Sequence, residues 1–402
     1  MKKTTRITLY LLSFLLITYT TKAQTKLSSE KYHIHRSALK NSYLKFANEK
    51  HGRVVFLGGS ITYNPGWRDS VCHYLTQKFP DTEFDFISAG IPSMGSTPAA
   101  FRFERDVLKN GPVDLLFEEA SVNDDTNHRK PEEITRGMEG IVRHALTANP
   151  ACDIVFMYFV DPGKMEHYRA GEIPEEIQLQ DAVAKYYDIS AINLAQEVTE
   201  RIDAGEFDWE NDFKNLHPSP FGQNIYFQSI KTFLEDQWTN DFPGAKITVP
   251  DIPEAIDEYS YSNGKLVEPN PKKAFKGWTM IENWQPKDGK GTRDNYVNVP
   301  MLEGTYPGKT IKFHFKGTAV GIAVAAGPDA GIIEYSVDNH PWKKQDLFTE
   351  WSNSLHLPWY FTLESELKDR SHTLQIRVSK DKNSESLGNV CRLRYFFFNA
   401  KE

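Results

Sequence analysis

The chain has 402 residues, of which 40% are apolar and 13% aromatic, so it is too long for one ordinary domain and rich enough in large side chains to fill two cores. Its net charge of -7 argues against a general nucleic-acid binder, because proteins of that class carry an excess of basic residues. The three cysteines form an odd and sparse set, which argues against a disulfide framework.

The N-terminus has the three-part pattern of a secretory signal peptide. Lys2, Lys3 and Arg6 precede an apolar run at 9–17, and a small residue, Ala23, ends the segment. The apolar run is short for a membrane span. We therefore predict that residues 1–23 are removed, that the protein is secreted or periplasmic, and that no membrane span remains; an uncleaved anchor is the alternative.

Strand-like and helix-like segments alternate over residues 25–242, which predicts a first domain with a parallel sheet covered by helices on both faces. The strand segments are continuous apolar runs, as expected for parallel strands that are buried on both sides. We expect strands at 53–57, 83–88, 113–118, 153–159 and 190–194, and helices near 66–79, 99–109, 132–147, 175–187, 195–203 and 220–235.

The pattern changes after residue 245. Prolines, lysines and turn residues prevail up to about residue 310, and β-type runs follow at 310–316, 319–326, 331–337, 357–363, 371–379 and 390–398. Some of these runs alternate apolar and polar residues, so one face of each strand is expected to be buried and the other hydrated. Strands without intervening helices predict a second domain at 245–402, an antiparallel β-sandwich of the jelly-roll kind.

Small and polar residues stand at the ends of the predicted parallel strands. Ser60 follows the first strand after two glycines, Gly90 follows the second strand, and Asn123 follows the third. His217 lies far downstream, in a loop just before the last predicted helix. Open parallel sheets hold their ligands at the carboxyl ends of the strands, so we expect these four residues to meet at one edge of the sheet.

These residue types are the ones that acyl transfer needs. Ser60 is the predicted nucleophile, and His217 is the predicted base that takes its proton and later passes it to the leaving alcohol. The negative oxygen of the tetrahedral intermediate needs preplaced donors. The backbone N–H groups of Ser60 and Gly90 and the side-chain amide of Asn123 would supply them.

The same four positions resemble the four sequence blocks of the SGNH (GDSL-like) hydrolases. The blocks here are Gly58-Gly59-Ser60-Ile61-Thr62, Gly90 in its turn, Val122-Asn123-Asp124 and Leu216-His217-Pro218, in the family's order. The resemblance implies a flavodoxin-like three-layer α/β/α fold and the hydrolysis of esters, often of acyl groups on carbohydrates. It also implies Ser60 as the nucleophile, Ser60, Gly90 and Asn123 as the oxyanion site, and His217 as the base.

One position departs from the family's pattern. The family usually has an aspartate three residues before the histidine, to orient its ring, and Lys214 occupies that position here. The nearest acid is Asp212, which we expect to reach the imidazole by a differently shaped loop. Two alternatives stay open: a Ser–His dyad with a backbone carbonyl that orients the ring, or another acid among Glu118, Glu119 and Asp124.

The other titratable residues suggest competing functions. Glu118 or Glu119 together with Asp124 or Asp125 would form the pair of acids that a glycosidase needs at about 5–9.5 Å. For the two glutamates, a buried hydrogen-bonding role near the site and simple exposure are equally acceptable. No histidine has the spacing of a metal site, so we expect neither a metal nor a cofactor.

The second domain carries a group of aromatic residues at Trp342, Trp351, Trp359 and Tyr360. Exposed aromatics stack on sugar faces, but aromatics of a sandwich are more often part of its core. Asp329 lies in a turn and would reach a substrate only if the two domains face each other.

The leading hypothesis is a secreted or periplasmic serine esterase that removes a small acyl group, acetyl first, from an oligo- or polysaccharide. Three alternatives remain: a lipid or thioester acylhydrolase with the same residues, an inactive carbohydrate-binding protein, and a glycosidase. The departure at Lys214 is the main support for the inactive protein. The sequence leaves the glycan and the oligomeric state open.

Overall fold

The computed structural model describes residues 26–270 and 276–400 of the chain. The predicted signal peptide at 1–23 lies outside these residues. No helix of the described part combines the length and the apolar character that a membrane crossing requires.

A mostly parallel sheet forms the centre of the first domain. In the described residues it has six strands in the order β1-β6-β5-β4-β2-β3, and the edge strand β1 pairs antiparallel with β6. The strands are β1 (His33–Ile34), β2 (His51–Gly58), β3 (Glu83–Gly90), β4 (Leu115–Glu118), β5 (Asp153–Met157) and β6 (Ser190–Ile192). Without β1, this is the flavodoxin-like order 2-1-3-4-5. The chain adds β3 on one side of β2 and the later strands on the other, so the switch point lies between β2 and β4.

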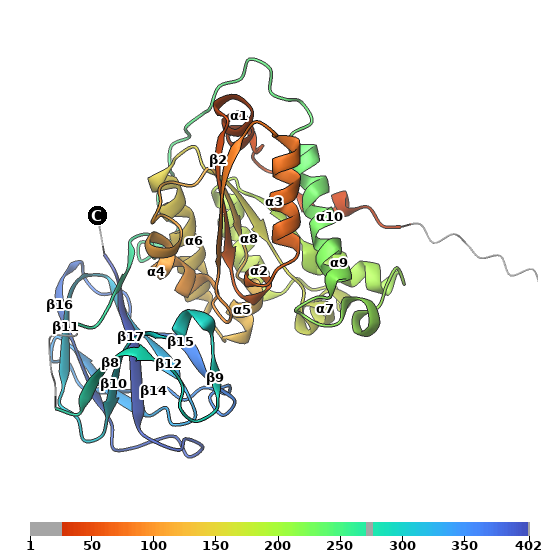
Figure 1. Ribbon diagram of the computed structural model, residues 1–402. Coiled ribbons are helices and arrows are strands. Elements are labelled where there is room, and N and C mark those ends of the chain that lie inside the picture. Colours follow the sequence, from red (N-terminus) through yellow and green to blue (C-terminus); the bar gives the residue numbers. More distant parts are fainter. Residues whose placement is uncertain (1–25, 271–275, 401–402) are drawn as a thin grey trace, which may run out of the picture.

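Helices cover both faces of this sheet and complete the three layers (Figure 1). α4, α6 and α8 pack together on one side, and α3, α9 and α10 lie on the other. The helices are α1 (Lys40–Leu44), α2 (Ser60–Tyr63), α3 (Trp67–Lys78), α4 (Ser96–Asp106), α5 (Ser121–Thr126), α6 (Pro131–Ala148), α7 (Pro162–Arg169), α8 (Glu175–Tyr186), α9 (Leu194–Asp203) and α10 (Pro220–Gln237), with short turns of helix at η1 (Ser29–Tyr32), η2 (Lys45–Glu49) and η3 (Trp209–Phe213). The predicted α/β/α architecture is confirmed.

The second domain consists of two sheets around their own core, antiparallel except where β9 pairs parallel with β15, which confirms the predicted sandwich. In the described residues, one sheet has seven strands in the order β8-β10-β17-β12-β15-β9, with β7 paired to β17, and the other has the order β11-β16-β13-β14. The strands are β7 (Gly264–Val267), β8 (Trp278–Trp284), β9 (Gly291–Thr292), β10 (Val299–Thr305), β11 (Ile311–Gly317), β12 (Ala319–Ala326), β13 (Ile332–Val337), β14 (Lys343–Asp346), β15 (Leu355–Glu364), β16 (Arg370–Val378) and β17 (Val390–Asn399), and η4 (Asp294–Tyr296) follows β9.

Strand β12 belongs to the cores on both of its sides, because both of its faces are buried. Val320, Ile322 and Val324 point into the core of the sandwich, while Ala323 and Ala325 belong to a core that continues into the first domain. Side chains alternate along a strand, so the sequence places branched residues on one face and small residues on the other. The small face lets the first domain approach closely.

Aromatic side chains fill the junction between the domains. The ring of Phe101 on α4 lies 4.4 Å from that of Phe397 on β17 and 4.7 Å from that of Tyr261, between centroids. Arg136 on α6 adds an ion pair with Glu366 of the second domain at 2.7 Å. These contacts hold the second domain against α4 and beside the end of the sheet where α2 and α5 begin (Figure 1). The domain boundary near residues 242–245 stays a prediction.

Candidate active site

Ser60 follows the central strand β2 at the point where the order of the sheet reverses. Residues 54–57 are buried, and α2 begins at Ser60 after two glycines. A Cβ atom on Gly58 would stand 2.3 Å from Glu119 Oε1, and one on Gly59 would stand 1.9 Å from Asn123 Oδ1. The two glycines therefore let Glu119 and Asn123 pack directly against the backbone that leads to the serine.

His217 reaches Ser60 from a position 157 residues further along the chain. Its Nε2 lies 2.7 Å from Ser60 Oγ, which is hydrogen-bonding distance. The loop that carries it lies between η3 and α10, and Ser219 begins α10 by accepting the N–H of Gly222. The backbone N–H of His217 also donates to Asn215 Oδ1 at 2.8 Å. These contacts hold the imidazole within reach of the serine proton.

The surroundings of His217 favour its neutral form. Loss of hydration lowers the pKa of the imidazole, and the positive charge of Arg293 lowers it further. A neutral imidazole has one nitrogen without a proton, so it accepts the proton of a serine hydroxyl. The electrostatics thus suit a base at neutral pH.

The structure does not bring Asp212 to the imidazole, contrary to our expectation. The Asp212 carboxylate accepts the backbone N–H of Asp208 at 3.0 Å, and its carbonyl accepts Ser219 Oγ at 2.5 Å. The reason is local: η3 turns the Asp212 side chain back toward its own start, and Lys214 follows with a positive φ of 86°. Among the described residues, neither a carboxylate nor a backbone carbonyl bonds to Nδ1 of His217.

Gly90 and Asn123 stand at the two strand ends that flank Ser60. The N–H of Ile91 donates to the carbonyl of Gly58 at 2.9 Å, so the preceding N–H, that of Gly90, points to the opposite side of the edge strand β3. Asn123, in the first turn of α5, lines the same cavity as Ser60 and His217. The N–H of Ser60 has no partner within α2, as in the first turn of any helix.

The two glutamates at the end of β4 are buried beneath the site. Glu119 Oε1 accepts the N–H of Gly59 at 2.6 Å and the hydroxyl of Thr62 at 2.9 Å, while burial raises the pKa of Glu119 to about 7. Burial, followed by the charges of Glu119 and Asp124, raises the pKa of Glu118 well above its usual value. Glu119 therefore positions the turn before Ser60, which decides between the buried and the exposed alternatives.

None of the four acids considered for a glycosidase, Glu118, Glu119, Asp124 and Asp125, lines the cavity. Glu118, Glu119 and Asp124 are buried, and Asp124 accepts the backbone N–H of Ser96. Within residues 26–270 and 276–400, Asp294 is the one carboxylate that lines the cavity, and its Oδ2 accepts the hydroxyl of Tyr63 at 2.7 Å. The same residues hold no group of three or more His, Cys, Asp or Glu arranged to bind a metal.

Both domains line this cavity, which has a volume of about 490 Å³. The first domain contributes residues from its strand ends and from the His217 loop. The second domain contributes Thr292, Arg293, Asp294, Trp351, Leu355 and Leu357. Sequence reasoning missed most of these residues because the turn-rich stretch before 310 gave no signal beyond its composition.

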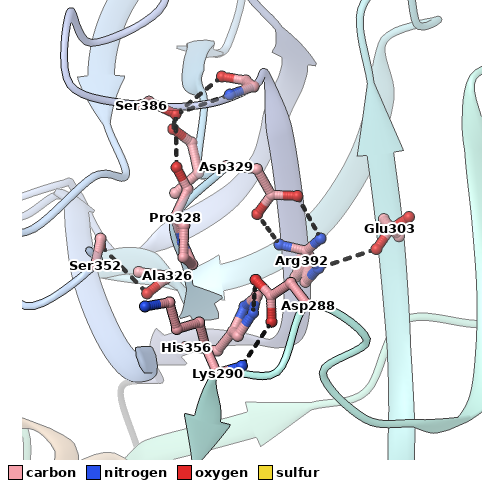
Figure 2. Close-up of polar contacts among 12 residues, drawn as sticks. Asp288, Lys290, Glu303, Ala326, Pro328, Asp329, Ser352, His356, Ser386 and Arg392 are labelled. Atoms are coloured by element: carbon pink, nitrogen blue, oxygen red, sulfur yellow. Dashed lines mark hydrogen bonds and ion pairs between the residues drawn. The ribbon is translucent and has the colours of Figure 1, made fainter. Parts of the chain in front are cut away.

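From the sequence, a group of aromatic residues and Asp329 of the second domain were candidates for contact with the substrate. The structure places these residues in different parts of the molecule. Trp351 lines the cavity, whereas Tyr360 is buried in the junction and Trp342 stacks on the guanidinium of Arg377. Asp329 lies outside the cavity: its carboxylate accepts two hydrogen bonds from Arg392, at 2.5 and 2.7 Å, as Figure 2 shows.

Comparisons with known proteins agree with this geometry. Residues 56–225 match the GDSL-like lipase/acylhydrolase family. Two crystal structures of a two-domain esterase active on acetylated mannans are similar over 93% of this chain at 18% identity. The one co-crystallised with mannopentaose is covered over 98% of its length with a TM-score of 0.73, and the other over 99% with 0.75. At this identity the likeness establishes a shared fold, second domain included. Curated proteins give no match.

The family match includes the positions of Ser60, Gly90, Asn123 and His217. The fold brings the first and the last of these into direct contact at the switch point of the sheet. The chain therefore contains a GDSL-like lipase/acylhydrolase domain and is an ester-hydrolysing serine hydrolase.

Proposed function

We propose that this protein is a secreted or periplasmic esterase that removes a small acyl group, acetyl first, from an oligo- or polysaccharide. The contact of 2.7 Å between Ser60 Oγ and His217 Nε2 is the observation that carries the chemistry. The glycan is supported by the fold shared with an esterase active on acetylated mannans. The signal-peptide pattern at 1–23 supports the location.

The reaction would begin with attack of Ser60 Oγ on the ester carbonyl, while His217 Nε2 takes the hydroxyl proton. The tetrahedral oxyanion would accept the N–H groups of Ser60 and Gly90 and the amide of Asn123. His217 would then pass its proton to the sugar oxygen, which leaves as the alcohol. Water would add to the acyl-serine by the same route in reverse order and release acetate.

In the part of the chain that the structure describes, no carboxylate is bonded to the ring that becomes an imidazolium in each step. Because no carboxylate bonds to Nδ1 within the described residues, we infer that the enzyme works as a Ser–His dyad. Neutral His217 is a sufficient base, since its lowered pKa keeps it unprotonated near pH 7. Asp212 is therefore not proposed as a member of the catalytic set.

The decisive experiment combines Ser60→Ala with a panel of acetylated glycans and nitrophenyl acetate. We expect the variant to lose acetate release from every substrate by about 10⁴-fold or more, as in other serine hydrolases without their nucleophile. Ser371→Ala changes an exposed serine outside the cavity and serves as the matched control.

Each competing function has its own signature in the same assays. A fluorophosphonate should label the wild type at Ser60, and failure to label would identify an inactive binding protein. Faster hydrolysis of long-chain esters than of acetyl esters would identify a lipid acylhydrolase. Reducing ends released without acetate would identify a glycosidase.

A further inference from the structure

The cavity extends beyond the space that an acetyl group needs. It measures about 490 Å³, whereas one water takes about 30 Å³ of liquid volume. The cavity therefore has room for part of the alcohol side of the ester as well. The wall that comes from the second domain is free of the residues proposed for the chemistry, so it is available for recognition of that alcohol.

A short network anchors this wall to strand β15, and Figure 2 shows its contact between His356 and Asp288. β9 pairs with the start of β15, and Thr292 Oγ1 donates to the carbonyl of His356 at 2.7 Å. The ring of His356, which is 2% exposed, places its Nε2 3.0 Å from Asp288 Oδ2. The segment that leads into Arg293 is thus held at Asp288, before β9, and at Thr292, within β9.

Among the described residues, no carboxylate forms an ion pair with Arg293 in this wall. Its Nη2 donates to Ser93 Oγ at 2.8 Å, and its Nε is buried with no hydrogen-bond partner. Thirteen other arginines of the described part of the chain form an ion pair with a carboxylate. Burial alone lowers the pKa of Arg293. A half-buried guanidinium in this state is costly unless a ligand completes its contacts.

Arg293 lies beside two parts of the proposed catalytic site, the turn after Gly90 and the imidazole of His217. Ser93, its one partner, lies three residues after Gly90, has a positive φ of 71°, and accepts Asn127 Nδ2 on its carbonyl at 3.0 Å. On the other side, the charge of Arg293 acts on His217. The guanidinium is therefore close to the proposed oxyanion site and to the base, where the alcohol part of the ester has to leave.

We propose, on the basis of the proposed function, that Arg293 is a specificity-determining residue that binds paired oxygen acceptors on the sugar carrying the ester. The guanidinium has only donors, arranged as a fork that fits two neighbouring oxygens. A sugar offers such a pair as two adjacent hydroxyls or as the carboxylate of a uronic acid. Trp351, 41% exposed in the same wall, gives the sugar ring an apolar surface.

The test compares Arg293→Gln and Arg293→Lys on three substrates: nitrophenyl acetate, acetylated manno-oligosaccharides and acetylated galacturonate oligosaccharides. For at least one glycan we expect Arg293→Gln to lower kcat/KM by about 10- to 100-fold, mostly through KM, as expected for the loss of a charge-assisted hydrogen bond. The loss with nitrophenyl acetate should be much smaller. Recovery of activity on the galacturonate by Arg293→Lys identifies a carboxylate partner, whereas failure of lysine on the neutral glycan identifies a diol, which needs the fork.

Controls separate recognition from folding. Arg370→Gln removes an exposed arginine of the same domain that lies outside this cavity. Trp342→Ala removes a tryptophan outside the cavity whose exposure is similar to that of Trp351. Neither change should alter the glycan preference. Fluorophosphonate labelling of Ser60 checks that the site of each variant is intact.

Two results would overturn the inference about Arg293 alone. One is an equal loss on glycans and on nitrophenyl acetate, and the other is no loss on any glycan that the wild type hydrolyses. A wild type that cleaves nitrophenyl acetate but no glycan would instead refute the proposed function and this inference with it.

Discussion

The two walls of the cavity differ in how the chain builds them. Most of the first-domain wall follows strands β2, β3 and β4, so the rigid sheet sets the positions of those residues, and Leu216 and His217 join them from the loop before α10. The second-domain wall consists of turns between strands of a sandwich, and it reaches the site only because the domains pack together. The residues proposed for the chemistry thus come from the first domain, while those proposed to face the alcohol come from a separate domain.

The junction makes this division of labour possible. Ala323 and Ala325 on β12 and Phe397 on β17 are part of one core with Phe101 of the first domain. Because interiors are packed to high density, such a core resists changes in the relative position of the domains. We therefore expect the second-domain wall to act as a fixed part of the site.

The largest effect in the first wall, after that of Ser60, is expected for Asn123. Removing one oxyanion donor typically lowers kcat by about 10²- to 10³-fold. Asn123→Ala should do so equally for nitrophenyl acetate and for glycans, measured as acetate release, because the oxyanion is common to all of them. Asn224→Ala, an exposed asparagine on α10, is the control. A loss confined to glycans would show that Asn123 binds the sugar rather than the oxyanion. It would contradict the proposed difference between the two walls.

The dependence of activity on pH links the two walls. The proposed mechanism needs neutral His217, and the pKa of this imidazole is lowered, so kcat/KM should fall only as the pH drops below about 6.5, the ordinary value. Arg293→Gln removes the smaller of the two causes. The acid limb for nitrophenyl acetate should therefore move to higher pH and still stay below the ordinary value.

One result of the same pH titration would contradict a link between the two walls. An acid limb that does not move in Arg293→Gln would show that the guanidinium does not act on the base. The two walls would then be electrostatically independent.

The smallest effect is expected for Asp212→Asn. The exposed carboxylate bonds to the N–H of Asp208 and not to the imidazole, so its loss should change kcat by less than about fivefold, the equivalent of a contact of 1 kcal/mol at most. An aspartate that orients the base of a triad contributes about 10⁴-fold. A loss of that size would show that the loop rearranges when substrate binds.

Most of the fold was predictable from sequence patterns. The parallel strands and the main helices lie where the apolar runs and helical periods predicted them, within a few residues. The prediction was incomplete at 245–310, where β8 and β10 belong to the larger sheet of the sandwich. These strands carry few buried residues, so their sequences lack the alternation that marks a half-buried strand.

The candidate site was predictable only in part. Ser60 and His217 are in contact, as expected, but their catalytic roles stay predictions until they are tested. The expectation for Asp212 rested on its short separation from His217 in the sequence. That separation does not predict where the carboxylate points when a tight turn intervenes. The function of Glu119 was left open because the side of the strand end that faces the core depends on neighbours distant in sequence.

The sequence by itself determined which residues follow the parallel strands, and hence that Ser60, Gly90 and Asn123 gather at one edge. That result follows from local rules: apolar runs make strands, and glycines allow the turns that end them. Only the tertiary structure decided that, among the described residues, no carboxylate bonds to the His217 ring and none forms an ion pair with Arg293 in the cavity wall. Both depend on how segments far apart in the chain pack against one another, and no local pattern encodes that packing.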